Sequence, residues 1–485
     1  LNELWRKRVK NDALSLMLTG KTWPEAAETL RKRYERLLAR VGQVSADDVF
    51  ETLMNAYAAV YDPHSNYFSP RSSEEYRIQM SLSYEGIGAS LQLVDDYVTI
   101  SALLAGGPAA AANTLKANDR ILAVGQGQDG PFTDVVGWRL DDVVQLIRGK
   151  GDTQVRLQIL PAGAAPGTDQ KVVALTRGKV TLENQAAKKE LRQVHLGERT
   201  LRVGVITVPG FYEDNDARSA GDPNYRTTAR DVRRLIGELQ AQGALDALVL
   251  DLRGDGGGYL PEATALSGLF IDHGPVVQLK TTDGSIEVLQ DPEPGIAYSG
   301  PLAVLVDRTS ASASEIFAAA IQDYHRGVVL GQTTFGKGTV QNLIPLDRWS
   351  RQSTEGQLTV TIGKFYRVTG ESTQLRGVEP DISLPARVSA QDVGESSLDY
   401  PLPWDRIAPV PFRADAPLAG AVQTLARDAS AHSARDADYQ WLVASLHSLE
   451  EARKDHAVSL NLVERQHERT TLEQQALARE NTRRA

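Results

Sequence analysis

Cysteine is missing altogether from this sequence of 485 residues, and no long apolar run is present. The first absence excludes disulfide bonds, thiolate zinc sites and cysteine nucleophiles. The second excludes a membrane-spanning helix, which needs roughly 20 consecutive apolar residues. No histidine stands with an acidic residue at metal-ligand spacing, so no metal site is predicted. A net charge of −9 argues against nucleic acid as the main partner, because a phosphate-binding surface needs clustered lysine and arginine.

The remaining composition is that of a globular protein, with 41% hydrophobic and 24% charged residues, and the length suggests about three domains. Residues 1–77 carry apolar positions at helical spacing, which predicts a helical region. Residues 78–177 hold short apolar runs split by glycine, asparagine and aspartate turns, which predicts a small β-rich domain. Strands alternating with helices over 178–390 predict a mainly parallel α/β core, and residues 391–485 are helical and charged.

A serine stands where a predicted buried strand gives way to a predicted helix, in the run from Asp307 to Phe317. This residue, Ser312, can project its hydroxyl while the helix N-terminus offers free backbone N–H groups. Such donors stabilise an oxyanion. Serine is also favoured at this position as a plain helix cap, so the run alone leaves a nucleophile and a cap equally open.

A lysine, Lys337, stands between two glycines after a predicted strand. Lysine acts as a general base only when it is uncharged, so its pKa must fall through burial, which Phe335 and Val340 would supply. A phosphate loop is disfavoured, because the glycine spacing differs from the Walker pattern and a glycine replaces the required serine or threonine. A surface lysine in a turn remains the commoner reading of an isolated Gly-Lys-Gly.

Three glycines, Gly256 to Gly258, follow the predicted buried strand that ends at Asp251. Their backbone can present amides to a ligand, although the same residues also suit a plain strand-to-helix turn. The spacing of a dinucleotide-binding loop is not present. Together the three segments supply a nucleophile, a base and oxyanion donors at the strand ends of one α/β core, where such sheets usually bind ligands.

With these segments in place, the sequence resembles the carboxyl-terminal processing proteases, and among them the tail-specific branch of the bacterial periplasm. The resemblance covers most of residues 50 to 385 and implies an α/β protease core of the ClpP/crotonase-like type, with an inserted, permuted PDZ domain and helical terminal regions. It rests on the motifs Tyr84-Glu-Gly-Ile-Gly, Gly137-Trp-Arg-Leu-Asp-Asp-Val-Val, Val208-Pro-Gly-Phe-Tyr, Asp251-Leu-Arg with Gly256–Gly258, Ser310-Ala-Ser-Ala-Ser-Glu-Ile-Phe-Ala-Ala-Ala and Phe335-Gly-Lys-Gly-Thr-Val-Gln.

The resemblance also assigns roles to single residues. The family's nucleophile falls on Ser312 and its general base on Lys337. Gln341 matches the glutamine that supports the lysine, and Asp323 matches an aspartate that we interpret as supporting rather than chemical. The implied oxyanion donors are the backbone N–H groups of Ala313 and of Gly258, in preference to Gly257.

The β-rich domain is similar to a bacterial PDZ domain, in which a peptide adds as a strand along a sheet edge and backbone amides hold its terminal carboxylate. The residues expected to bind such a tail are Gly86, Ile87, Gly88, Ala89 and Leu91, and Leu91 and Leu93 are expected to line an apolar pocket for its last side chain. The resemblance therefore implies protein substrates with exposed apolar C-termini, including peptidoglycan hydrolases, and a lipoprotein adaptor with helical repeats. It leaves a homo-oligomer open and implies neither a cofactor nor a nucleic acid partner.

The N-terminal run, residues 1–8, lacks the apolar core and cleavage site of a signal peptide and has the pattern of a helix interior. We therefore expect a mature or trimmed chain, and the resemblance implies the periplasm of a Gram-negative bacterium. The function expected is that of a serine endopeptidase with a Ser-Lys dyad. The alternative is a catalytically inactive protein that binds peptides or small ligands on the same core. The presence of both Ser312 and Lys337 favours the peptidase.

Overall fold

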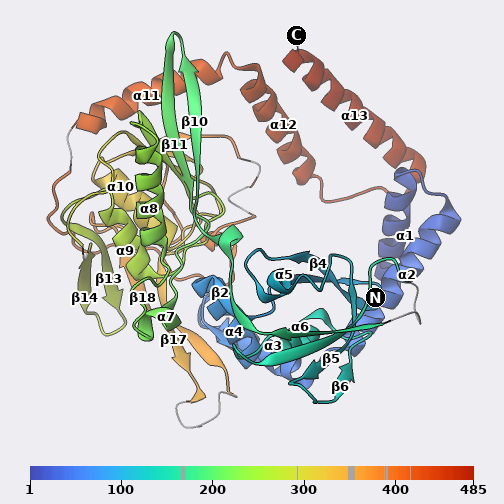
Figure 1. The fold of residues 1–485 in the computed structure, drawn as a ribbon. Coiled ribbons are helices and arrows are strands. Elements are labelled where there is room, and N and C mark those ends of the chain that lie inside the picture. The colour runs from blue at the N-terminus through green and yellow to red at the C-terminus, as the bar shows by residue number, and fades with distance from the viewer. Residues whose placement is uncertain are drawn as a thin grey trace.

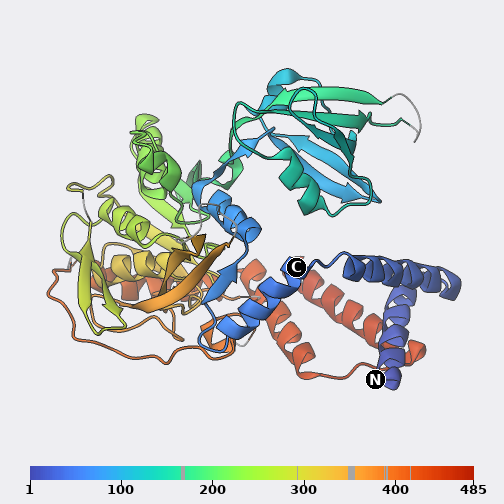
Figure 2. The same ribbon diagram turned by 90° about the horizontal axis from the view of Figure 1, so that it is seen from below.

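The computed structural model describes residues 1–164, 170–291, 293–347, 355–386, 388, 392–414 and 417–484. A large α/β core lies beside a small β domain, and the helices from both ends of the chain lie together (Figure 1). In Figure 2 the small β domain and the terminal helices extend from the core on different sides. A search of the described helices for one with the length and apolar character of a bilayer crossing finds none.

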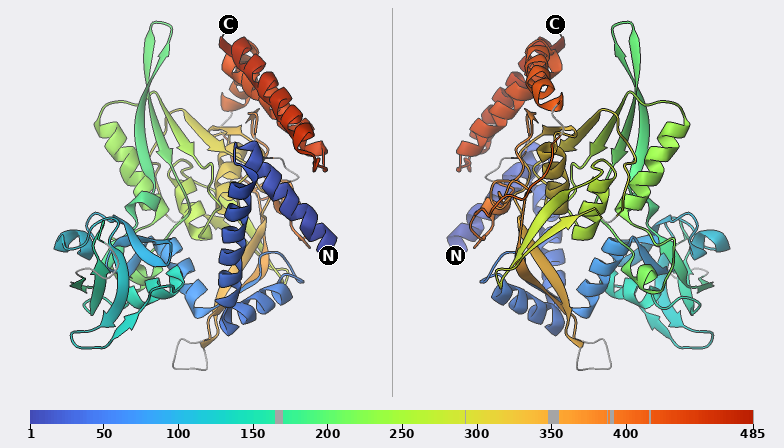
Figure 3. Two further views of the ribbon diagram at one scale, coloured as in Figure 1. Left: turned by 90° about the vertical axis from the view of Figure 1, so that its right-hand side faces the viewer. Right: turned by 90° about the vertical axis from the view of Figure 1, so that its left-hand side faces the viewer.

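The core is built on a six-stranded sheet in the order β10-β11-β12-β15-β16-β19. All neighbouring strands run parallel except the β10–β11 pair, which forms a long hairpin that projects from the core (Figure 3). The mainly parallel core predicted from the alternation of strands and helices is thus present. The strands are β10 (Lys188–Leu196), β11 (Arg199–Thr207), β12 (Ala247–Asp251), β15 (Leu302–Val306), β16 (Val328–Gly331) and β19 (Ile382–Ser383).

Helices pack on this sheet through apolar stripes at helical spacing. In α8 (Thr228–Ala241), Val232, Leu235, Ile236 and Leu239 are buried, and the Thr227 side chain caps the helix start. These four apolar residues of α8 belong to the same core cluster as residues of α9 (Leu260–Gly268) and α10 (Ala313–Asp323). A short helix, α7 (Asn215–Ser219), precedes α8. The carboxyl ends of β12, β15 and β16 therefore lead into loops at one edge of the sheet.

A second, antiparallel sheet flanks the core and was not predicted from the sequence. Its order is β1-β18-β13-β14, and β17 also pairs with β18. The first strand comes from the N-terminal region, where Asn66 pairs with Thr359, so residues 1–77 are not wholly helical. The strands are β1 (Asn66–Phe68), β13 (Pro275–Thr281), β14 (Ile286–Gln290), β17 (Thr339–Pro345) and β18 (Gln357–Tyr366).

The small β domain has its own core around a sheet in the order β3-β4-β5-β7-β8, with β6 paired to β5. A two-stranded ribbon, β2–β9, connects it to the rest of the chain. Strand β3 lies at the edge of the sheet. The elements are β2 (Ser83–Gly86), β3 (Ala89–Val94), β4 (Tyr97–Leu103), α5 (Pro108–Ala112), β5 (Arg120–Gln126), β6 (Phe132–Asp134), α6 (Leu140–Ile147), β7 (Gln154–Leu160), β8 (Lys171–Thr176) and β9 (Gly178–Thr181).

The two ends of the chain meet as helices. Arg465 on α13 donates to the side chain of Asn11 on α1 at 2.8 Å, and Figure 3 shows the two ends on the same side of the core. Helices are present from Pro417 onward, whereas the described residues 392–414 hold only a 3-10 turn, and the predicted boundary at 390 lies outside the described residues. The helices are α1 (Asn2–Leu18), α2 (Trp23–Gly42), α3 (Ala46–Ala58), α4 (Pro70–Ser81), α11 (Pro417–Ser433), α12 (Ala437–Lys454) and α13 (Leu462–Arg484), with 3-10 turns at Glu183–Gln185 and Glu395–Ser397.

Candidate active site

Ser312 lies at the junction of β15 and α10, in a backbone conformation that serine rarely adopts. Its φ is +55° and its ψ is −110°. A positive φ at a residue other than glycine costs about 1–3 kcal/mol and persists only where the surroundings enforce it. The turn is bonded on both sides: the Ser310 hydroxyl donates to the carbonyl of Leu252 at 2.8 Å, and the Ser312 N–H donates to Glu315 at 2.8 Å. The serine is therefore held in a tight turn at the N-terminus of α10.

Lys337 follows β16 in a loop that is packed against its neighbours. The preceding residue, Gly336, has a φ of +95°, and a Cβ there would lie 3.0 Å from the carbonyl carbon of Leu375. Only glycine fits such a backbone at this distance. Burial lowers the pKa of Lys337 below its ordinary value, against the opposing pull of the carboxylates of Glu395, Glu315 and Asp62. Lys337 is half-buried, and the lowered pKa expected of a lysine base accompanies this partial burial.

Glu315 on α10 joins the serine turn to the lysine loop. Its side chain is 0% exposed and accepts the backbone N–H of Ser312 at 2.8 Å, of Gly336 at 2.7 Å and of Lys337 at 2.9 Å. The hydroxyl of Thr334 is a fourth donor. Burial raises the pKa of Glu315 to about 7, against the effect of these donors. One buried carboxyl group thus sets the spacing of the two loops.

The glycine loop, residues 252–258, lies directly against the serine turn. A Cβ at Gly257 would lie 2.8 Å from the Cβ of Ser312 and 3.0 Å from the amide nitrogen of Ala313. The Gly257 amide already donates to Asp255 at 2.8 Å, so it is not a free oxyanion donor. Among the described contacts, the amides of Gly258 and Ala313 have no acceptor. Of the three predicted donors, these two are available.

Gln341 and Asp323 lie apart from the lysine in different ways. Gln341 lines the same cleft as Lys337, but its amide donates at 3.0 Å to the hydroxyls of Thr339 and Thr361 and not to the lysine. Asp323, at the far end of α10, forms an ion pair with Arg367 and is not a lining residue of the cleft. Any effect of Asp323 on chemistry must therefore be indirect.

The serine–lysine cleft is the cavity of about 1160 Å³ that contains both Ser312 and Lys337. The described contacts include no direct hydrogen bond between the two side chains. Catalytic hydrogen bonds are often long in the absence of substrate, so this geometry remains compatible with a dyad. The residues that line the cleft include Gly256, Gly257, Gly258, Ala313, Ile316, Val340, Gln341 and Leu343.

A second polar network behind the lysine loop was missed from the sequence. The Glu395 side chain is 0% exposed, contacts His64 Nε2 at 2.8 Å and accepts from Gln374 at 2.7 Å. Gln374 in turn accepts the backbone N–H of Gly338 at 2.8 Å. These partners lie far apart along the chain, so no local pattern signals them. Glu315 had such a signal, since a serine followed three residues later by glutamate is typical of a helix capping box.

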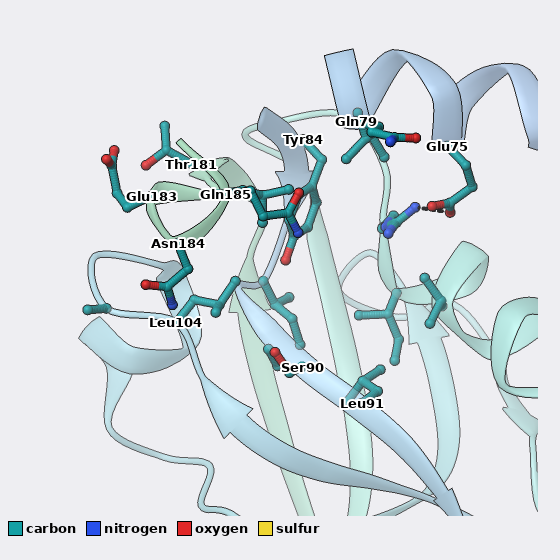
Figure 4. Close-up of a pocket in the computed structure, with 18 residues that line it drawn as sticks. Glu75, Gln79, Tyr84, Ser90, Leu91, Leu104, Thr181, Glu183, Asn184 and Gln185 are labelled. Atoms are coloured by element: carbon teal, nitrogen blue, oxygen red, sulfur yellow. Dashed lines mark hydrogen bonds and ion pairs between the residues drawn. The ribbon is translucent and has the colours of Figure 1, made fainter. Parts of the chain in front are cut away.

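The PDZ groove is the cavity of about 880 Å³ between β3 and α6. Figure 4 shows Ser90 and Leu91 on strand β3, across from Glu75 and Gln79 on α4. Of the five residues predicted to bind a tail, Ile87, Ala89 and Leu91 line the groove. The other two are not lining residues: Gly86 pairs with Gly178 in the ribbon, and a Cβ at Gly88 would lie 2.9 Å from the Cα of Gly107. Gly88 thus permits close backbone packing, whereas a Cβ at Gly86 would lie 2.9 Å from the Tyr84 ring. The expectation that Leu93 lines the pocket is wrong, because this residue is exposed and lies outside the groove.

The PDZ groove and the serine–lysine cleft share part of their walls. Gln79, Asn184 and Gln185 line both cavities, and Figure 4 shows them around one end of the groove. The side-chain amides of the three residues are exposed and make no hydrogen bond in the part of the chain that the structure describes. An amide can both donate to and accept from a peptide backbone. The two cavities are therefore adjacent along a polar wall.

Four family descriptions match the chain. They are the tail specific protease N-terminal domain at residues 1–71, the PDZ domain at 75–160, peptidase family S41 at 202–384 and the C-terminal domain of tail specific protease at 388–485. A solved PDZ domain of a carboxy-terminal protease from Vibrio cholerae, in complex with peptide, is 51% identical and covers 21% of this chain and 100% of that chain, with a TM-score of 0.20.

Curated relatives match over most of the chain. A tail-specific protease of Haemophilus influenzae is 45% identical over 412 residues, which cover 84% of this chain and 56% of the relative. The chain thus spans little more than half the length of that relative. A carboxy-terminal processing protease of Bacillus subtilis is 30% identical over 383 residues, which cover 76% of this chain and 73% of the relative. The chain therefore belongs to peptidase family S41, with the carboxy-terminal processing proteases.

Proposed function

We propose that this protein is a serine endopeptidase that uses Ser312 as nucleophile and Lys337 as general base, and that it acts on proteins held by their apolar C-terminal tails. The observation that carries the proposal is the pairing of the strained Ser312 turn with a half-buried lysine of lowered pKa in one cleft, where the backbone N–H groups of both residues donate to Glu315. Membership of family S41 supports the same reaction, since the matched relatives are named as proteases.

The chemistry follows from the groups in the cleft. The Ser312 hydroxyl attacks the peptide carbonyl, and its proton passes to the uncharged Nζ of Lys337. The carbonyl oxygen becomes negative and accepts the N–H groups of Ala313 and Gly258. The lysine then gives its proton to the leaving amine, which leaves an acyl-enzyme. Water attacks this ester, the lysine again removes a proton, and the serine is restored.

The lowered pKa of Lys337 is what suits it to this role. An amine with an ordinary pKa is almost wholly protonated at neutral pH and cannot accept the serine proton. Burial disfavours the charged form, so a larger fraction of Lys337 is neutral at a given pH. The carboxylates of Glu395, Glu315 and Asp62 limit that fall. The base therefore operates between two opposing electrostatic influences.

The tail enters through the PDZ groove in this proposal. An extended peptide adds to the free edge of β3, and Ile87, Ala89 and Leu91 contact its apolar side chains. The chain preceding the tail then passes Gln79, Asn184 and Gln185 into the serine–lysine cleft. Four further points stay predictions of the family resemblance. They are a periplasmic location, peptidoglycan hydrolases as substrates, a lipoprotein adaptor with helical repeats and a homo-oligomer.

The test compares wild type, Ser312→Ala and Lys337→Ala on an unfolded protein with an apolar C-terminal tail. Both variants are expected to lose turnover while binding the tail with the wild-type Kd. The same substrate with a charged tail is the control, and it should be cut slowly by the wild type. Full activity in Lys337→Ala would overturn the base assignment. Tail binding by wild type without any cleavage would favour the inactive binding protein.

A further inference from the structure

One buried carboxyl group beside the cleft has no place in this mechanism. Asp255, in the glycine loop, is 0% exposed. Its Oδ1 accepts the N–H of Gly257 at 2.8 Å, whereas its Oδ2 is buried with no hydrogen-bond partner in the described part of the chain. Buried carboxylates are normally paired with a cation or fully hydrogen-bonded, because an unpaired buried charge is strongly disfavoured. The missing partner therefore calls for an explanation.

The main chain of Asp255 is fixed to the serine turn. Its carbonyl oxygen accepts the N–H of Ala311 at 3.0 Å and the hydroxyl of Ser314 at 2.9 Å. Its own N–H donates to the carbonyl of Leu252 at 3.1 Å. These bonds place the residue between the strand end and the start of α10. By holding the Gly257 amide, the carboxyl group leaves the next amide, that of Gly258, free for an oxyanion.

The charged groups around Asp255 do not neutralise it. On its own loop, Arg253 pairs with Asp251 at 2.7 Å. From the loop after β15, Asp307 accepts the Gly254 N–H at 3.2 Å, and the first turn of α10 carries a further acidic residue, Glu315. Lys337 lines the cleft, which Asp255 does not, and the two residues have no described contact. Burial raises the pKa of Asp255 to about 8, against the effects of the Gly257 N–H and of the nearby Ser314 hydroxyl, whose own hydrogen bond goes to the Asp255 carbonyl oxygen.

We propose that Asp255 is a neutral carboxylic acid in the working enzyme and acts as a positioning residue for the oxyanion donor at Gly258. Its protonated form orients the glycine loop without placing a charge beside the serine. Its ionised form would put a negative charge next to the site where the oxyanion develops and would weaken that interaction. Two experiments test this inference. The kinetic experiment rests on the proposed peptidase function, whereas the stability experiment does not.

The kinetic experiment uses Asp255→Asn, which keeps the shape and the Oδ1 acceptor but cannot ionise. In wild type, kcat/KM for the tail-bearing substrate should fall about tenfold per pH unit above about pH 8 as Asp255 loses its proton. The variant should remain active at pH 7 and lose this alkaline fall. Asp255→Ala, which leaves the Gly257 amide unpaired, should lower kcat without changing the Kd for the tail.

The stability experiment needs no cleavage. The folded pKa of Asp255 lies above its unfolded value, so wild type loses stability as pH rises from about 4 to 8. The Tm of Asp255→Asn relative to wild type should therefore increase between pH 5 and pH 8. The control, Asp283→Asn, removes an exposed carboxylate whose pKa is lowered to about 2, and it should show no such increase.

The outcomes separate the two proposals. If wild type cuts no substrate but the pH-dependent gain in Tm appears, the peptidase assignment fails and the neutral Asp255 stands. If Asp255→Asn keeps the alkaline fall, or shows no growing gain in Tm, Asp255 is not the neutral group. A variant that is inactive at every pH while it binds the tail normally would mean that the ionised carboxylate is required, which also overturns the proposal.

Discussion

The polar side chains of the serine–lysine cleft come from segments far apart in the chain, whereas the PDZ groove has the edge strand β3 and the helix α6 of the small domain on two of its walls, with α4 and the turn after β9 completing it. In the cleft, Glu315 is 0% exposed and contacts both the serine turn and the lysine loop. In the groove, Leu91 is only half-buried and the free edge of β3 offers backbone atoms. The cleft is thus held by buried side-chain hydrogen bonds and the groove by a strand and its apolar residues.

This difference predicts different responses to substitution. A catalytic geometry tolerates little displacement, because an error of about 1 Å between reacting groups can cost about 100-fold in rate. A groove that binds extended backbone tolerates more, because much of its affinity comes from main-chain hydrogen bonds. Changes that disturb the cleft should therefore act on kcat, and changes in the groove should act on KM.

The largest effect is expected from Glu315→Gln. One carboxylate oxygen accepts from Thr334 and Gly336 and the other from Ser312 and Lys337, so an amide would turn an N–H donor toward two of these four donors. We expect kcat to fall about 100-fold or more with the tail Kd unchanged. Single-turnover kinetics with the tail-bearing substrate would measure the loss.

A matched control for this change is Glu262→Gln on α9. Glu262 is also buried, and burial raises its pKa to about 7, but it accepts the N–H of Ala229 and does not line the cleft. This variant should alter the Tm while it keeps kcat. Equal losses of kcat in the two variants would mean that any buried glutamate of the core matters equally. The claim that Glu315 positions the serine turn and the lysine loop would then fail.

A smaller effect than that of Glu315→Gln is expected on the pH profile of kcat/KM, through the pKa of Lys337. In the proposed mechanism Lys337 must be neutral to accept the serine proton, so kcat/KM should rise about tenfold per pH unit up to the pKa of Lys337. The Glu395 carboxylate stabilises the charged ammonium and raises that pKa. Glu395→Gln removes the negative charge, so the pKa should fall and the acid limb should move to lower pH.

The control for this shift is Asp392→Asn, which removes an exposed carboxylate that pairs with Arg453. It should leave the acid limb in place. A pH profile of kcat/KM from about pH 5 to pH 8 for the three proteins provides the measurement. An acid limb that moves to higher pH in Glu395→Gln would contradict the electrostatic account, because it would require the carboxylate to favour the neutral amine.

The sequence predicts the local parts of this architecture well. The strand that ends at Asp251 and the strand that ends before Asp307 are short, largely apolar runs, which are typical of strands inside a parallel sheet. Ser312 and Lys337 stand in glycine-rich or small-residue turns directly after such strands. Strand, turn and candidate residue are adjacent in the chain, so one window of sequence holds the whole signal.

The parts that the sequence does not predict depend on contacts between distant segments. Strand β18 lies between β1 and β13, and its pairing of Thr359 with Asn66 joins positions 293 apart. The contact of His64 with Glu395 joins positions 331 apart. Asp323 is the opposite case. The family motif predicts that it supports the active site, but in the structure it pairs with Arg367, a contact that depends on tertiary packing. Periodicity carries no information about such pairs.

The smallest effect that still separates the two regions is expected from Leu91→Asp in the PDZ groove. Leu91 lines the groove, and burying a leucine against a ligand is worth about 1.5–3 kcal/mol, so KM for an apolar tail should rise about tenfold or more while kcat stays unchanged. Leu93→Asp is the matched control, because Leu93 lies on the same strand but is 50% exposed and outside the groove. A short peptide without an apolar tail should be cut equally by wild type and both variants. If Leu91→Asp instead lowers kcat for that short peptide, the groove and the cleft are coupled, and the contrast between a rigid cleft and a separate binding groove must be abandoned.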